Sequence, residues 1–460
     1  MNVTDGLPAA ERRRALITLG IAVAMAVLDT AIANIALPTI ARSLDVDPAA
    51  SIWVVNGYQL AVTVALLPLA SLGDIHGYKR VYQAGLAVFT VASLVCAFAP
   101  SMPVLVIARA VQGLGAAGIM SVNTALIRFV FPRSQLGRGV GFIALVVATS
   151  SASGPSVAAA ILSVASWHWL FLINVPLGLL ALYLAARALP ATPSSGHRFD
   201  ALGAMLSALV FGLLVTSVDG VGQEASRWLI AAEVVAMLAA GSVFIRRQLR
   251  LPAPILPLDL FRKPVFALSV GTSICTYAAQ SLAYVTLPFY FQYVGGQSQI
   301  ETGLLVTPWP LVVVFVAPVA GRLSDRYPPT VLGALGLLTM TLGLLTVLAM
   351  PAQAAHLDIA WRMALCGLGF GFFQSPNNRI LIGSASPERS GAASGMLATS
   401  RLLGQTLGSA MVALVFGLIG ATDAAGIARA GTAAIAMAAC FTVLGGTVSV
   451  FRWRQARRSA

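Results

Sequence analysis

The chain has 460 residues, of which 58% are hydrophobic and only 10% are charged. A water-soluble protein carries about a quarter of its residues as charged side chains, so this composition excludes a chain of ordinary soluble domains. The net charge is +13, but the basic residues stand in short clusters between apolar runs and form no basic stripe of the kind that binds nucleic acid. We therefore expect an integral membrane protein whose partner is the lipid bilayer and not nucleic acid.

The first predicted element is an apolar run over 15–38 that follows Arg12, Arg13 and Arg14. It is too long for a signal-peptide core and lacks a cleavage site, so we expect an uncleaved transmembrane helix. Segments of about 20 mainly apolar residues, the length needed to cross a bilayer, recur along the whole chain. The predicted spans are 15–38, 51–73, 80–99, 103–128, 138–162, 168–188, 200–219, 228–246, 264–292, 300–322, 330–350, 359–383, 391–420 and 427–451. This pattern predicts an all-α integral membrane protein with fourteen transmembrane helices.

Basic residues give the orientation of these helices. Most Arg and Lys residues fall on one set of alternating connections, and only Arg42, Arg227, Arg362 and Arg429 fall on the other. Because basic residues are retained on the cytoplasmic side, we expect both termini in the cytoplasm. The predicted location is the cell inner (plasma) membrane, crossed many times.

An internal repeat divides the chain. SLGDIHGYKR at 71–80 matches GRLSDRYPP at 321–329, and RAVQGLGAAG at 109–118 matches RMALCGLGFG at 362–371. Repeats of this kind, related by an axis along the membrane normal, build the two halves of many transporters. We predict an N-terminal six-helix bundle over 1–190, an inserted two-helix hairpin with cytoplasmic linkers over 191–263, and a C-terminal six-helix bundle over 264–460.

Asp29 lies inside the first predicted helix, where a carboxylate costs roughly 2.5–3.5 kcal/mol. A buried carboxyl holds a proton more readily than an exposed one, so Asp29 is a predicted proton carrier; the alternative is a permanently paired structural aspartate. Arg109 lies at a similar depth, about 9 Å into the fourth helix, and is the natural partner, as a coupling group or in a static salt bridge. Glu233, the other acid that lies away from the loops and helix ends, is in the eighth helix, outside the repeat.

Further polar groups lie within the predicted spans. Gly154 and Pro155 either allow the fifth helix to bend or serve only in the packing of that helix against its neighbours. Arg401, near the middle of the thirteenth helix, meets either an anionic substrate group or backbone carbonyls. Polar and aromatic residues are candidates for a substrate cavity, although Trp53 and Tyr290 are equally typical of an interfacial belt. The cavity candidates are Asn34, Trp53, Asn56, Tyr58, Gln59, Tyr284, Tyr290, Asn377, Asn378 and Arg401.

No pattern of residues indicates an enzyme or a metal site. The sequence lacks the phosphate-binding loop GxxxxGK[ST], and its four cysteines and four histidines are scattered without metal-ligand spacing. We therefore expect no cofactor and no enzymatic activity, and a proton gradient as the energy source.

Five segments carry a family resemblance: LDTAIANIALP at 28–38, SLGDIHGYKR, RAVQGLGAAG, ATSSASGPSVAA at 148–159 and WHWLFLINVPLG at 167–178. Their order and spacing resemble the major facilitator superfamily, specifically its fourteen-spanner drug:proton antiporters of the EmrB/QacA type. The resemblance implies the major facilitator fold, protonation at Asp29, and proton transfer involving Arg109. It also implies an antiporter motif at Gly154 and Pro155. The implied conformational latch on the cytoplasmic side comprises Asp74, Gly77, Lys79 and Arg80, with Asp325 and Arg326 as the counterparts in the repeat.

The resemblance implies multidrug efflux, in which small lipophilic compounds leave the cell in exchange for protons by alternating access, as in antibiotic resistance. Some similar proteins use an extra acid in helix 10 for divalent cationic drugs, and 303–320 contains none, so we expect neutral or monovalent cationic substrates. The alternatives are a dedicated exporter of an endogenous metabolite or antibiotic and a membrane receptor or scaffold that transports nothing. We expect a functional monomer that works alone or with a periplasmic adaptor protein.

Overall fold

The computed structural model describes residues 6–132, 135–192, 199–222, 226–251, 258–351, 353–384 and 390–458, and within them it contains helices and no strand. The first helices are α1 (Ala9–Ser43), α2 (Pro48–Ser51), α3 (Trp53–His76), α4 (Tyr78–Ala97), α5 (Met102–Val130), α6 (Leu136–Val164), α7 (His168–Leu172) and α8 (Asn174–Ala188). They are followed by α9 (Ala201–Gly222), α10 (Arg227–Gln248), η2 (Leu260–Arg262), α11 (Pro264–Phe289) and η3 (Tyr290–Val294). The last are α12 (Gln299–Val306), α13 (Pro308–Leu323), α14 (Pro329–Leu348), α15 (His356–Gly383), α16 (Ser390–Ile419) and α17 (Ala424–Arg458).

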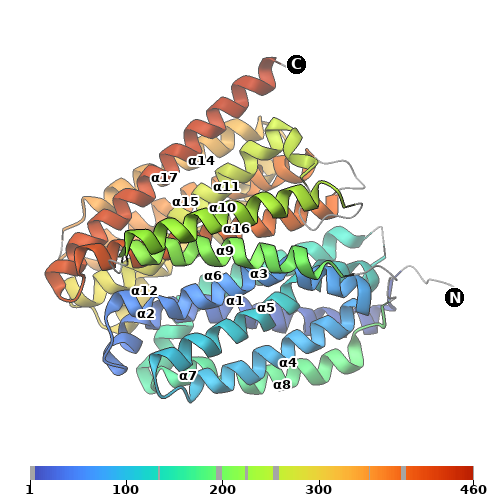
Figure 1. Cartoon of the computed structure of the whole chain (residues 1–460), viewed down its shortest axis with the longest axis horizontal. Coiled ribbons are helices and arrows are strands. Elements are labelled where there is room, and N and C mark those ends of the chain that lie inside the picture. Colours follow the sequence, from blue (N-terminus) through green and yellow to red (C-terminus); the bar gives the residue numbers. More distant parts are fainter. Residues whose placement is uncertain are drawn as a thin grey trace.

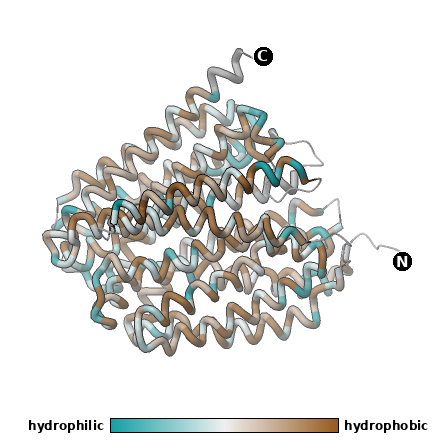
Figure 2. The backbone as a smooth tube through the Cα atoms, viewed as in Figure 1, coloured by the Kyte–Doolittle hydropathy of each residue, from teal (hydrophilic) through white to brown (hydrophobic). Residues whose placement is uncertain are grey.

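Several helices extend beyond the spans predicted for them. The span predicted over 15–38 is part of α1, and the span predicted over 427–451 is part of α17. Hydropathy marks only the part of a helix that matches the bilayer core, whereas backbone hydrogen bonding continues into the polar flanks. Figure 2 shows this directly, since hydrophobic residues follow the lengths of the helices and hydrophilic residues gather mainly near their ends.

Thirteen helices in the described part of the chain are long and apolar enough to cross a membrane. The predicted span 359–383 falls on α15, which has 28 residues but is not among the thirteen. This helix carries the polar side chains Asp358, Arg362, Gln374, Asn377, Asn378 and Arg379, which lower its hydropathy. The count of fourteen transmembrane helices therefore stays a prediction.

The helices form two groups of neighbours. In the first, α1 packs against α6 and α8, and α5 packs against α3 and α4; in the second, α11 packs against α16 and α17, and α14 against α15 and α17. The groups meet where α3 contacts α16 and where α6 contacts α12 and α13. Helices α9 and α10 pack against each other, and α9 also contacts α3 and α16, so this pair lies at the seam between the groups (Figure 1). The proline-rich parts of both predicted linkers, 193–198 and 252–257, lie outside the described residues.

Candidate functional site

Asp29 lies in α1 with only 2% of its surface exposed, and three side chains donate hydrogen bonds to it. The guanidinium of Arg109, from α5, forms an ion pair with Oδ2 of Asp29. The amides of Gln112 and Asn174 each donate to Oδ1, with both nitrogen-to-oxygen distances 2.8 Å. Hydrogen bonds that involve a charged group are stronger than those between neutral groups, so these contacts hold α1, α5 and α8 together at Asp29.

Arg109 is completely buried, and its other contacts fix its orientation. Its Nε donates to the carbonyl oxygen of Val54 at 3.0 Å, and its Nη1 also donates to Oε1 of Gln112 at 2.6 Å. The guanidinium carbon lies 4.3 Å from the ring centroid of Tyr58 and 5.5 Å from that of Phe171. Its Nη2 has no hydrogen-bond partner among the described residues. Asp29 and Arg109, paired by sequence reasoning, are thus in direct contact.

Small residues bring these side chains together. A Cβ atom at Gly113 would lie 2.5 Å from the carbonyl oxygen of Tyr58, so only glycine lets α5 approach α3 this closely at the turn that follows Arg109. A Cβ at Gly178 would overlap the side chain of Thr90 in α4. Gly178 is one helical turn after Asn174, and its close approach to α4 helps to direct that amide toward Asp29.

Sequence reasoning missed two members of this network, Gln112 and Asn174. Gln112 also donates to the hydroxyl of Ser93 at 2.8 Å, and both Gln112 and Asn174 are nearly or fully buried. Each is an amide side chain inside an apolar helix, which was the available signal, and each lies within a segment that carried the family resemblance. Glu233 is not part of the network: it is partly exposed on α10, a helix whose main contacts are with α9.

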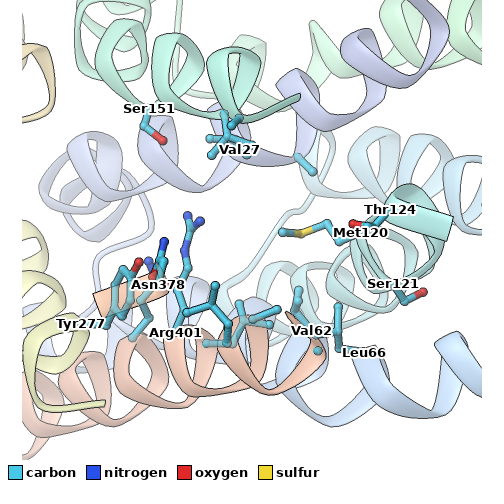
Figure 3. A pocket seen from close by; sticks show the side chains of 18 of the residues that line it. Val27, Val62, Leu66, Met120, Ser121, Thr124, Ser151, Tyr277, Asn378 and Arg401 are labelled. Atoms are coloured by element: carbon cyan, nitrogen blue, oxygen red, sulfur yellow. The ribbon is translucent and has the colours of Figure 1, made fainter. Parts of the chain in front are cut away.

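A cavity of about 1720 Å³ lies between the two groups of helices. Its walls come from α1, α3, α5 and α6 on one side and from α11, α13, α15 and α16 on the other, as Figure 3 shows for Val27 and Ser151 facing Tyr277 and Arg401. Six of the predicted cavity residues line it: Asn34, Tyr58, Gln59, Tyr284, Asn378 and Arg401.

Four other predicted cavity residues lie outside this lining. Asn377 is fully buried, donates to Ser273 Oγ at 2.8 Å and accepts from Arg452, so its amide is held inside the second group of helices. Asn56 is also fully buried. Trp53 and Tyr290 lie near the ends of the spans Pro48–His76 and Pro264–Val294, as interfacial residues do.

Tyr58 contacts both the ion pair and the cavity. Neither Asp29 nor Arg109 lines the cavity, whereas Tyr58 lines it and also lies against the guanidinium of Arg109. The hydroxyl of Tyr58 donates to the carbonyl oxygen of Ala26 at 3.3 Å, which fixes the ring between α3 and α1. This ring is therefore one direct contact between the cavity and the ion pair.

The cavity extends to the end of the bundle where α3 ends and α4 begins, and Asp74, Arg128 and Asp200 line it there. Partial burial acts to raise the pKa of Asp200, but hydrogen bonds from Arg247 and from the backbone N–H of Gly203, with the charge of Arg247, hold this pKa below its ordinary value. The distance from Arg247 Nη2 to Asp200 Oδ1 is 2.7 Å, and this ion pair ties the start of α9 to the end of α10.

The residues of the predicted latch lie at this same end. Asp74 accepts a hydrogen bond from the Tyr78 hydroxyl, and Lys79 Nζ donates to the carbonyl oxygens of Ala186 and Leu189 at 3.0 and 2.7 Å. Gly77 has a φ of +92°, which favours glycine at the turn between α3 and α4. In the second group, Asp325 forms an ion pair with Arg379. Arg80 and Arg326 are exposed.

At the opposite end of the bundle, the two groups contact each other through residues that do not line the cavity. Arg42 Nη2, at the end of α1, donates to Oε1 of Gln292 at 2.6 Å, and its guanidinium carbon lies 5.3 Å from the ring centroid of Tyr293.

The predicted antiporter motif lies in a closely packed part of α6. A Cβ at Gly154 would overlap Ala31 of α1, and a Cβ at Gly303 of α12 would lie 2.5 Å from the carbonyl oxygen of Pro155.

The sequence is similar to a family of known transporters. A family model described as the Major Facilitator Superfamily matches residues 19–409. The chain is 56% identical over 418 residues to the uncharacterized transporter YebQ of Escherichia coli strain K12, covering 90% of this chain and 92% of YebQ. It is 30% identical to the riboflavin transporter RibZ of Clostridioides difficile strain 630, with 87% of each chain covered. It is 31% identical to the multidrug resistance protein Stp of Mycobacterium tuberculosis strain CDC 1551 / Oshkosh, covering 87% of this chain and 75% of Stp.

A solved structure shares the fold. The crystal structure of a bacterial homolog to the human lysosomal transporter Spinster, in an inward-facing and occupied conformation, has a TM-score of 0.70 to this chain. The match covers 97% of this chain and 98% of that one at 14% sequence identity. At this identity the likeness concerns the arrangement of the helices alone.

Proposed function

The chain belongs to the Major Facilitator Superfamily, and we propose that it exports small lipophilic compounds across the bacterial inner membrane in exchange for protons. The observation that carries this proposal is the buried ion pair between Asp29 and Arg109, placed directly behind a large cavity. An ionisable pair inside a membrane helix bundle is expensive and is typical of proton relays. Tyr58 contacts Arg109 of the ion pair and also lines the cavity, so it links the proposed proton site to the proposed substrate site.

The proposed topology has fourteen transmembrane helices and both termini in the cytoplasm. Residues 1–190 and 264–460 form the two six-helix bundles, and 191–263 form the inserted hairpin. The separate packing of the two helix groups and the mutual packing of α9 and α10 support this division. In this orientation the cavity faces the cytoplasm, and the contact between Arg42 and Gln292 closes the outer side.

The proposed cycle uses the two bundles as rocking units. A compound enters the cavity from the cytoplasmic side, and the bundles then rock until the outer contacts open and the cytoplasmic end closes. A proton from outside neutralises Asp29, which weakens its hold on Arg109, and the compound leaves. After the return step Asp29 releases the proton inward. The gradient supplies about 2.3 kcal/mol per charge per 100 mV and about 1.4 kcal/mol per pH unit.

Export of foreign compounds is supported by the likeness to Stp, whose name describes multidrug resistance. The apolar side chains Val27, Val62, Leu66 and Met120 in the cavity wall suit lipophilic compounds. The name of RibZ gives a single compound, riboflavin, and this likeness favours a second candidate, a dedicated exporter of an endogenous metabolite or antibiotic. Comparing the compounds released by cells with and without the protein separates these two candidates.

The test is drug-driven proton movement in proteoliposomes that contain the full chain and a pH-sensitive dye. Wild-type protein is expected to move protons when a lipophilic compound is added, and Asp29→Asn is expected to abolish this signal. Glu233→Gln is the matched control, because it also removes one acidic group, but on α10. Coupling at the wild-type level in Asp29→Asn would refute the proton role of Asp29, and a complete lack of gradient-dependent flux in wild type would favour the receptor or scaffold alternative.

A further inference from the structure

Arg401 is set apart from the other charged residues of the cavity by its depth. Among the described residues four charged side chains line the cavity, and three of them lie at helix ends. Asp74 and Arg128 are in the last turns of α3 and α5, and Asp200 directly precedes α9. Arg401 stands near the middle of α16 (Ser390–Ile419). The interior of the cavity therefore carries one positive charge, and no described carboxylate lines it at that depth.

Arg109 and Arg452, the buried arginines among the described residues, have partners that the partly exposed Arg401 lacks. Arg109 is paired with Asp29, and Arg452 Nη1 donates to Ser269 Oγ at 2.7 Å and to Asn377 Oδ1 at 2.8 Å. Within the described part of the chain Arg401 forms no ion pair and no hydrogen bond, and its recorded contact is with the ring of Tyr277, whose centroid lies 5.8 Å from the guanidinium carbon. In Figure 3 its side chain points into the cavity. Its N–H donors are thus available to a bound molecule.

The surroundings of Arg401 are aromatic and polar. Tyr277 packs edge-on against Phe370 at a centroid distance of 5.5 Å, and both rings line the cavity. The hydroxyl of Tyr277 accepts a hydrogen bond from Gln374 Nε2 at 2.9 Å, which holds the ring in place. Asn378 lines the same part of the cavity. Aromatic and amide side chains therefore border the space into which the guanidinium points, and a bound aromatic ring can contact the part of Tyr277 that lines it.

We propose that Arg401 and Tyr277 form a subsite for an aromatic weak acid, in which the guanidinium binds the single anionic group and Tyr277 contacts the ring. This inference rests on the proposed function, since it names a substrate class for the same cavity. A guanidinium presents parallel N–H donors that match a carboxylate in a bidentate manner. A monovalent cation, by contrast, meets a like charge at this depth. Aromatic monoanions are therefore added to the neutral compounds expected from the sequence, and cations are disfavoured.

The test uses purified full-length protein in detergent and three probes of one shape: 2-naphthoate, neutral 2-naphthamide and the (2-naphthyl)trimethylammonium cation. Equilibrium dialysis measures the affinity of each probe for wild type, Arg401→Gln, Arg401→Lys and Arg246→Gln. Arg246 is the matched control because it is exposed on α10 and its replacement removes the same charge. Size-exclusion profiles and melting temperatures establish that each variant is folded.

Wild type is expected to bind naphthoate at least about tenfold more tightly than naphthamide, since hydrogen bonds to charged groups are worth about this much or more. Arg401→Gln is expected to remove that preference, Arg401→Lys to retain part of it, and Arg246→Gln to retain all of it. Equal affinities of wild type for the acid and the amide, or an unchanged preference in Arg401→Gln, would overturn the subsite.

The same measurements keep the two proposals apart. If the subsite is absent while Asp29-dependent proton movement with a neutral compound persists, only the substrate class is wrong. If naphthoate binds through Arg401 but no compound drives proton movement, the subsite stands and the exporter proposal fails.

Discussion

The ring of Tyr58 contacts Arg109, with its centroid 4.3 Å from the guanidinium carbon, and the same residue lines the cavity. This side chain therefore contacts both a buried ion pair and a space of about 1720 Å³. A ring that contacts both a cation and a bound compound is well placed to link their energies, because an aromatic face attracts the cation by as much as about 2 kcal/mol when desolvated.

Removal of this ring is expected to uncouple the protein. Tyr58→Ala opens a path from the cavity to Asp29, so we expect proteoliposomes to leak protons without any transported compound. Tyr58→Phe keeps the ring and loses only the hydroxyl that donates a hydrogen bond to Ala26, so vesicles with this variant are expected not to leak protons. A pH-sensitive dye inside the vesicles measures the leak. Tight, fully coupled transport by Tyr58→Ala would show that the ring is not a barrier.

The stability of the first helix group is expected to depend on Gly113. A Cβ at this position would lie 2.5 Å from the carbonyl oxygen of Tyr58, so Gly113→Ala must push α5 away from α3. We expect a loss of about 1–3 kcal/mol, as for other overpacked sites, measured as a lower melting temperature in detergent. Gly271→Ala on α11 is the control, since a Cβ there meets nothing within 4 Å. Equal melting temperatures for the two variants would contradict the close helix contact.

The ion pair between Asp200 and Arg247 is expected to make the stability of the α9–α10 pair depend on pH. Asp200 lies just before the span Ala201–Val218, and its pKa in the folded protein is held below the ordinary value of about 3.9. A lowered pKa means that the stabilisation is fully present above pH of about 4 and is lost as the pH falls through the folded-state pKa.

Hydrogen–deuterium exchange in the first turns of α9 checks this expectation. At pH 7 these amides should exchange more slowly in wild type than in Asp200→Asn, and the difference should vanish on acidification below the folded-state pKa. Glu233→Gln, on the same helix pair, should exchange like wild type at both pH values. A difference that persists in strong acid would mean that the variant acts through packing and not through charge.

Local properties of the chain determined its class. The lengths of apolar segments predicted a helical protein that crosses the membrane many times. Asp29, an acid inside the first predicted helix, was a predicted proton carrier before any of its contacts was known. Such inferences succeed because hydropathy and the cost of a buried charge are properties of short stretches of sequence. The pairing of Asp29 with Arg109 followed from their similar depths, a one-dimensional quantity.

The tertiary structure decided what depth cannot specify, namely the direction in which each side chain points around its helix. It placed Gln112 and Asn174 on Asp29, put Asn377 inside a bundle and its neighbour Asn378 in the cavity wall, and turned Arg401 toward open space. Adjacent residues on a helix differ in direction by about 100°. Only the packing of every helix against its neighbours, set by contacts such as those of Gly113 and Gly178, fixes which direction meets the cavity and which meets another helix.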